Sequence, residues 1–124
     1  MKLLRRILII EDDPHIGSIL KIGLTVEKFE IQIQDDGREG IKQAKTFRPD
    51  LVLLDLIMPK ADGVTVLKLF KADPELANIP IVIVSAKADE AQRQLVRDLG
   101  ASDFLVKPFH LNDLMTLIDE WTEL

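Results

Sequence analysis

Four short apolar runs, each followed by a residue that can do chemistry, constrain the fold of this chain more than any other feature. The runs are residues 7–10 before Glu11, Asp12 and Asp13, residues 51–54 before Asp55, residues 81–84 before Ser85, and residues 104–106 before Lys107. Buried strands of a parallel sheet read as short continuous apolar runs. Ligands of open α/β sheets bind just beyond the carboxyl ends of such strands. The sequence therefore predicts one sheet edge that gathers carboxylates, a hydroxyl and an ammonium, which together suit a divalent cation and a phosphoryl group.

Helical and strand patterns alternate along the rest of the chain. A helix is predicted to begin near Pro14, and further helices are predicted over residues 38–47, 64–71, 88–99 and 111–121. Residues 30–34 alternate between polar and apolar side chains, which is the period of a strand with one solvated face. Gly100 is placed to end the fourth helix, and residues 59–63 are predicted to form a loop.

Five strands in alternation with five helices predict right-handed strand–helix–strand units and a parallel sheet covered on both faces, an α/β three-layer sandwich. The strand at residues 30–34 belongs at an edge, because it alone has polar alternation. We therefore predict the flavodoxin-like order 2-1-3-4-5 rather than a closed barrel, which needs more strands. This order makes neighbours of the strands that end at Asp12, Asp55, Ser85 and Lys107. Residues 1–124 are expected to form a single domain.

The composition excludes several classes of function. The chain has no cysteine, so disulfides, thiol redox chemistry and thiolate metal sites are excluded. Its net charge of -5 and the lack of a basic stripe argue against direct binding of nucleic acid by this chain. The apolar run that follows the basic residues 1–6 is too short for a signal-peptide core or a membrane span. We therefore expect a cytoplasmic domain that does not bind membranes.

Asp55 has two interpretations. An acid that ends an apolar run is costly to bury unless its carboxylate leaves the core, so Asp55 could be an ordinary strand-end residue that faces water or caps a turn. It could instead be a nucleophilic carboxylate that forms an acyl phosphate. Alone, the first interpretation is favoured. Beside the acidic residues that follow the first strand, the second is favoured.

Three acidic residues stand between the first strand and the first helix. Capping of the helix explains Asp13 but not three acids in a row opposite Asp55. Carboxylates that close repel one another, and a hard divalent cation relieves the repulsion through oxygen ligands. We therefore predict a Mg²⁺ site with Asp12 and Asp55 as direct ligands and Glu11 as a ligand directly or through water. The backbone carbonyl of Ile57 would complete the ligands that the protein supplies.

The two remaining strand ends offer a hydroxyl and an ammonium. Ser85 is either an ordinary turn residue or a donor to a phosphoryl oxygen on Asp55. Lys107 precedes Pro108, so its backbone is extended or turned and its peptide bond can be cis. Lys107 is either a solvated strand end or the charge that neutralises a transferred phosphoryl group. Phe104, three residues earlier, is by default a core aromatic residue.

Together these features resemble the receiver domain of two-component response regulators, of the chemotaxis-regulator type. The resemblance covers essentially the whole chain. The matching stretches are, in order, ILIIEDD, DLIMPKADG, VSA and GASDFLVKPF. One such stretch would be weak evidence, but four in register are highly specific.

The resemblance implies a phosphorylation-dependent signalling switch. In the family, a histidine kinase or phosphotransfer protein supplies a phosphoryl group to the residue that corresponds to Asp55, and Glu11 and Asp12 match the residues that hold Mg²⁺. Such a domain is not an enzyme, since it catalyses only its own phosphorylation and dephosphorylation. It controls a downstream protein or an output domain.

The resemblance also implies how the switch works. Ser85 turns toward the phosphoryl group, Phe104 swings inward behind it, and Lys107 forms an ion pair with the phosphorylated Asp55. The expected output face is the fourth helix, the fifth strand and the fifth helix, here residues 88–124. Phosphorylation adds charge and acceptor oxygens, so it biases a two-state element through local hydrogen bonds.

Two positions bear on the lifetime of the phosphorylated form. Ile57 is apolar and Lys87 is basic. In the family these places tune how water reaches the phosphorylated carboxylate. Because an apolar side chain cannot orient that water, we expect an intermediate or long lifetime.

The last helix is the feature that bears on partners. Its predicted core stripe is Leu111, Leu114, Met115 and Ile118, and a flank of that stripe carries Leu117, Trp121 and Leu124. Burial of this flank against a neighbouring helix is slightly favoured over an exposed edge for a partner or a second copy in a homodimer. The helix is acidic and has no Lys or Arg, which argues weakly against the pairing used by receivers of the winged-helix DNA-binding class.

Other readings of the sequence remain open. The chain could be a stand-alone receiver or relay carrier, or the N-terminal receiver of a longer regulator. The alternative from another class is a small phosphohydrolase with Asp55 as nucleophile. Haloacid-dehalogenase-like phosphatases need a second Asp two residues after the nucleophile, where this chain has Ile57. A flavodoxin would need a hydroxyl-rich phosphate loop where this chain has three acids.

Overall fold

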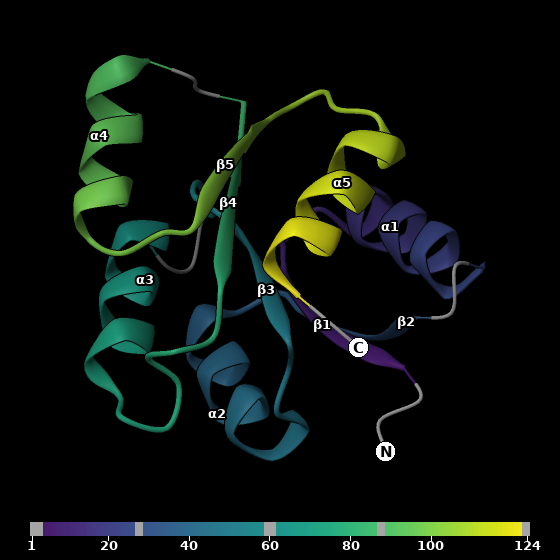
Figure 1. Ribbon diagram of the computed structural model, residues 1–124, viewed down its shortest axis with the longest axis horizontal. Coiled ribbons are helices and arrows are strands. Elements are labelled where there is room, and N and C mark those ends of the chain that lie inside the picture. The colour runs from purple at the N-terminus through teal and green to yellow at the C-terminus, as the bar shows by residue number, and fades with distance from the viewer. Residues whose placement is uncertain (1–3, 27–28, 59–61, 87–88, 123–124) are drawn as a thin grey trace.

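The computed structural model describes residues 4–26, 29–58, 62–86 and 89–122, and within them five parallel strands form one sheet between two layers of helices (Figure 1). The strands are β1 (Arg5–Ile10), β2 (Phe29–Gln34), β3 (Leu51–Asp55), β4 (Ile81–Ser85) and β5 (Asp103–Val106). Their order is β2-β1-β3-β4-β5, and every pairing is parallel. The predicted order and the edge position of the second strand are confirmed.

The helices divide between the two faces of the sheet. They are α1 (Pro14–Val26), α2 (Gly37–Phe47), α3 (Gly63–Ala72), α4 (Glu90–Asp98) and α5 (Leu111–Trp121). Alternate residues of a strand point to opposite faces, so the continuous apolar runs supply two cores. One core packs the strands against α2, α3 and α4, and the other packs them against α1 and α5 (Figure 1). Among the described residues, no helix is both long and apolar enough to cross a membrane.

Aspartate side chains fix where the helices begin. Asp36, Asp62 and Asp89 each accept a hydrogen bond from a backbone N–H in the first turn of α2, α3 and α4. Asp13 does the same for α1, since its Oδ1 accepts the N–H of His15 at 2.9 Å. The predicted cap at Asp13 is therefore confirmed, and each of these aspartates satisfies one first-turn amide that lacks a helical partner.

The last helix spans Leu111–Trp121 as predicted, and the limits of the others differ from the predicted ones by at most two residues. The helix predicted over residues 88–99 is Glu90–Asp98, because Asp89 caps it, and residue 88 lies outside the described residues. Gly100 follows this helix with φ +105, the left-handed conformation expected of a residue that ends a helix. The predicted loop at residues 59–63 is described only for its last two residues, which cap and begin α3.

Gly63 lies where the chain turns back on β3. A Cβ at this position would lie 2.6 Å from both the Cα and the carbonyl oxygen of Leu56, which are backbone atoms and cannot give way easily. We expect Gly63→Ala to lower the free energy of unfolding by about 2–3 kcal/mol in urea denaturation. Gly17→Ala is the matched control: its Cβ would lie 3.4 Å from the Ile33 side chain, so helix propensity should leave it neutral or more stable. Equal destabilisation of both variants would contradict this account.

Candidate functional site

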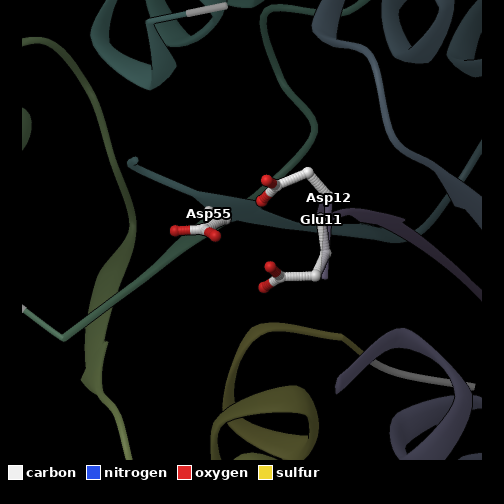
Figure 2. A group of neighbouring side chains, drawn as sticks. All are labelled: Glu11, Asp12 and Asp55. Atoms are coloured by element: carbon white, nitrogen blue, oxygen red, sulfur yellow. The ribbon is translucent and has the colours of Figure 1, made fainter. Parts of the chain in front are cut away.

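Three carboxylates meet at the carboxyl ends of β1 and β3. These strands are neighbours, with Ile10 paired to Leu54, so the residues that follow them come together. Oxygen atoms of Glu11, Asp12 and Asp55 all lie within 4.8 Å of one another. Figure 2 shows the carboxyl groups of Glu11 and Asp12 directed toward Asp55. The predicted cluster of acids at one sheet edge is confirmed.

Two of these carboxylates are buried and held by the backbone. Glu11 is 5% exposed and Asp55 is 6% exposed, whereas Asp12 is half-buried. The backbone N–H of Ile57 donates to Asp55 Oδ1 at 3.1 Å, and the backbone N–H of Asp13 donates to Glu11 Oε1 at 3.2 Å. The carboxylates are therefore oriented before any ligand arrives, and the remaining oxygens of the two buried groups face the ammonium described next.

Lys107 joins the cluster from the end of β5. Its Nζ lies 2.8 Å from Glu11 Oε2 and 3.3 Å from Asp55 Oδ2. Its backbone N–H donates to the carbonyl of Ser85 at 2.9 Å, and its peptide bond to Pro108 is cis, which the sequence allowed. The sequence placed Lys107 opposite Asp55. It did not reveal Glu11 as the nearer partner, because the two strands involved are not adjacent in the sheet and no motif joins residues 96 positions apart.

Burial and neighbouring charges shift the pKa values of Glu11 and Lys107. Burial, together with the nearby Asp55 carboxylate, raises the pKa of Glu11 from 4.5 to about 7 against the opposing effect of Lys107. Burial alone would lower the pKa of Lys107, but its hydrogen bond to Glu11 and the charge of Asp55 raise that pKa above its ordinary value. Three carboxylates against one ammonium leave an excess of negative charge. A donor set of three close oxygens with this charge fits a hard divalent cation such as Mg²⁺.

The other predicted site residues lie around this cluster. Ser85 is fully buried at the end of β4, next to β3, and is paired in register with Val106. Phe104 is paired with Ile83 and is half-buried, so the expectation of a core aromatic residue holds only in part. The side chain of Ile57 is 58% exposed. Lys87 lies outside the described residues.

The last helix buries its predicted stripe, but its flank only in part. Leu114 and Ile118 are fully buried, and Leu111 and Met115 pack against the same core, so the predicted stripe is confirmed. The flank was expected to be buried, but Trp121 is 42% exposed. The indole N–H of Trp121 donates to Asp103 Oδ2 at 3.2 Å, and this hydrogen bond keeps the ring at the surface. Leu117 packs against the core, and Leu124 lies outside the described residues.

The raised pKa of Glu11 predicts a pH dependence of cation binding. As the pH falls through about 7, Glu11 gains a proton and loses the charge that attracts a cation. Mg²⁺ affinity, measured by calorimetric titration, should therefore be about tenfold weaker at one pH unit below this pKa than at one unit above it. Glu11→Gln should bind Mg²⁺ more weakly and with little pH dependence. An unchanged slope in this variant would contradict the assignment of the titration to Glu11.

The raised pKa of Glu11 also predicts how the stability of the metal-free protein depends on pH. Between pH 4.5 and about 7, the folded chain holds a proton on Glu11 that the unfolded chain has released. The free energy of unfolding of the metal-free protein should therefore fall as the pH rises through this window. Glu11→Gln should flatten that fall in urea denaturation at several pH values.

Comparison with protein families places these residues in a known pattern. A model of the response regulator receiver domain matches residues 7–119. The DNA-binding dual master transcriptional regulator RpaA of Synechocystis sp. is 36% identical over 113 residues. The match covers 91% of this chain and 47% of RpaA, so the chain spans about half the length of that curated relative.

Solved structures agree with the fold. Chemotaxis protein CheY4 of Vibrio cholerae has a TM-score of 0.91 over 96% of this chain and 99% of its own, at 24% identity, which establishes the likeness of the fold. The receiver domain of sensor histidine kinase PA1611 from Pseudomonas aeruginosa PAO1 has a TM-score of 0.87 at 25% identity, over 95% of this chain and 97% of its own. That structure has a magnesium ion coordinated in the active site cleft.

Proposed function

Since this chain belongs to the response regulator receiver domain family and is the receiver domain of a two-component response regulator, we propose that Asp55 accepts a phosphoryl group from a histidine kinase or phosphotransfer protein. The observation that carries this proposal is the setting of Asp55 at the end of β3. Its Oδ1 accepts the backbone N–H of Ile57, and its Oδ2 lies 3.3 Å from the ammonium of Lys107. One carboxylate oxygen is thus oriented as a nucleophile, with a positive charge already beside the place where the transferred group would lie.

The proposed reaction is a displacement at phosphorus. One carboxylate oxygen of Asp55 forms the new O–P bond as the bond from phosphorus to the donor's leaving atom breaks, and an acyl phosphate results. Lys107 then pairs with the phosphoryl oxygens, and the hydroxyl of the buried Ser85 donates a hydrogen bond to one of them. Positioning and charge stabilisation account for most of the rate in such transfers, because the protein supplies little covalent chemistry beyond the nucleophile.

The carboxylate cluster is the proposed Mg²⁺ site. Glu11, Asp12 and Asp55 would hold the ion together with the backbone carbonyl oxygen of Ile57. When bound, Mg²⁺ offsets the negative charge that phosphoryl oxygens bring next to three carboxylates. The three close oxygens support this assignment, as does the magnesium ion in the cleft of the PA1611 receiver domain.

Signalling requires that this local charge change reach a partner. We propose that Ser85 and Phe104 move on phosphorylation and alter the face made by α4, β5 and α5, within residues 88–124, of which residues 88, 123 and 124 lie outside the described part. The output would be a downstream protein or an output domain, as in the much longer DNA-binding relative RpaA. The exposed, apolar Ile57 cannot orient a water against Asp55, so we propose a phosphorylated form of intermediate or long lifetime.

The chain is a signalling protein and not an enzyme, as its family membership establishes. A small phosphohydrolase with Asp55 as nucleophile would need an acid or base poised to activate water for each turnover. Ile57 stands two residues after Asp55 with its apolar side chain 58% exposed and cannot do this. The described site therefore suits retention of a phosphoryl group better than its repeated release.

Beryllofluoride, a stable mimic of an acyl phosphate, tests this proposal. In fluorine NMR, we expect bound resonances with the wild-type chain only when Mg²⁺ is present, and none with Asp55→Asn. Asp35→Asn removes an exposed carboxylate and should bind like the wild type. Bound resonances with Asp55→Asn, or equal binding without Mg²⁺, would refute the assigned site.

A further inference from the structure

Phe104, the aromatic residue proposed to move on phosphorylation, is covered by the side chain of Arg93. The guanidinium carbon of Arg93, on α4, lies 5.1 Å from the ring centroid of Phe104, on β5. Phe104 also packs against the core shared by α2, α3 and α4. Both side chains are half-buried and border a small cavity of about 130 Å³. The ring of Phe104 is therefore held between apolar core and guanidinium.

This pair differs from the two other cation–π pairs among the described residues. In those pairs, Arg5 covers Phe29 and Arg6 covers Phe47, both rings are almost fully buried, and each arginine also has an ion pair with a carboxylate. Those arginines are anchored by more than the ring that they cover, and the rings have no room to move.

Arg93 has no comparable anchor within the described part of the chain. Its Nε is buried without a hydrogen-bond partner, and no ion pair involves its guanidinium. Leaving a buried donor unpaired is costly, so the arginine would turn toward water unless the ring held it. The stacking on Phe104 is the interaction that keeps it in place.

Hydrogen bonds fix the backbone of Phe104, but they do not fix its ring. Its N–H donates to Asp103 Oδ1 at 2.8 Å, and the other oxygen of Asp103 accepts the indole N–H of Trp121. The main chain is therefore tied to α5, and the ring position depends on apolar contacts and on Arg93. A change at Arg93 should alter where the ring lies without moving the strand.

We propose that Arg93 is a positioning residue. It holds the Phe104 ring in its outer position and so opposes the inward movement that follows phosphorylation. This inference rests on the proposed function, in which the ring moves inward after Asp55 is phosphorylated. The ring is half-buried beneath the guanidinium, so an inward movement requires it to leave Arg93. A cation–π contact at a partly exposed site changes such an equilibrium by about two- to fivefold.

The test uses three variants of the full chain. Arg93→Met removes the charge but keeps an unbranched stem, Arg93→Lys keeps a cation, and Arg97→Met is the control one turn further along α4, where the exposed arginine borders the same cavity but covers no ring. The first readout is the rotamer population of isotope-labelled Phe104 by NMR, without metal or phosphodonor. The second is the rate of adduct formation with acetyl phosphate and Mg²⁺.

We expect Arg93→Met to lower the resting rotamer population and raise the phosphorylation rate by about two- to fivefold, Arg93→Lys to restore most of both, and Arg97→Met to change neither. In a Phe104→Leu background, Arg93→Met should have no further effect on the rate. An unchanged rotamer population in Arg93→Met would overturn the inference whatever Asp55 does. If the rotamer population of Phe104 shifts in Arg93→Met but no phosphoryl adduct forms on any variant, the role of Arg93 in positioning the ring would be supported. The proposed function would then be refuted instead. A shifted population with an unchanged rate would overturn the link to the switch.

Discussion

Lys107→Met is expected to lower the free energy of unfolding by about 2–3 kcal/mol above pH 7 in the absence of metal. The variant leaves Glu11 and Asp55 buried beside each other without the ammonium that lies 2.8 Å and 3.3 Å from them. Breaking a buried pair by removing one partner is strongly destabilising, because a charge remains that water cannot solvate. The loss should be smaller than for a fully buried pair, since the Lys107 side chain keeps 17% exposure.

The size of this loss in unfolding free energy depends on how buried the ion pair is rather than on its distance. Lys45 offers a control. Lys45 Nζ also lies 2.8 Å from a carboxylate oxygen, that of Asp73, but the Lys45 side chain is 48% exposed. Lys45→Met should therefore change stability very little. In urea denaturation, the loss in Lys107→Met should also shrink at acidic pH, where Glu11 takes up a proton and its charge disappears. Equal losses in both variants, or a loss that does not vary with pH, would contradict the account.

Asp12→Asn is expected to weaken Mg²⁺ binding by about 10- to 100-fold. The substitution keeps the shape of the side chain but removes one of the three charges whose oxygens lie within 4.8 Å of one another. Because Asp12 is only half-buried, the fold should tolerate the change, so the effect reports on the ion and not on unfolding. Calorimetric titration of Mg²⁺ against the folded variant measures it.

Asp35→Asn is the matched control for Asp12→Asn. Asp35 is exposed, borders the cleft beside Glu11 and Asp12, and carries the same charge, but it does not belong to the close carboxylate cluster. Its loss should weaken Mg²⁺ binding only slightly, through the screened field of one exposed charge. If both variants weakened binding to the same extent, the protein would attract the cation by a diffuse field and not by direct ligands.

The fold could be predicted from the sequence because its central strands, β1, β3 and β4, are buried on both faces over most of their length. Residues 7–10 and 51–54 are almost fully inaccessible, and such runs leave little choice other than the interior of a parallel sheet. The polar alternation of residues 30–34 placed β2 at the edge for the complementary reason. Once the order of strands was known, the meeting of Glu11, Asp12 and Asp55 followed from the geometry of strand ends.

What the sequence could not give depends on contacts between distant segments. The ion pair of Lys107 with Glu11 joins two strands separated by β3 and β4, and side-chain length and rotamer decide it. The stacking of Arg93 on Phe104 depends on how α4 lies against β5, which no spacing encodes. Trp121 remained at the surface because Asp103 offered its indole N–H a partner, a pairing that periodicity in α5 cannot reveal.

Intact mass after incubation with acetyl phosphate tests most directly whether Asp55 accepts a phosphoryl group. The wild-type chain and Asp55→Asn would be compared with and without Mg²⁺. The account predicts a single phosphoryl adduct on the wild type that requires Mg²⁺ and is absent from the variant. An adduct of the same extent on Asp55→Asn, or no adduct on the wild type in the presence of Mg²⁺, would contradict it.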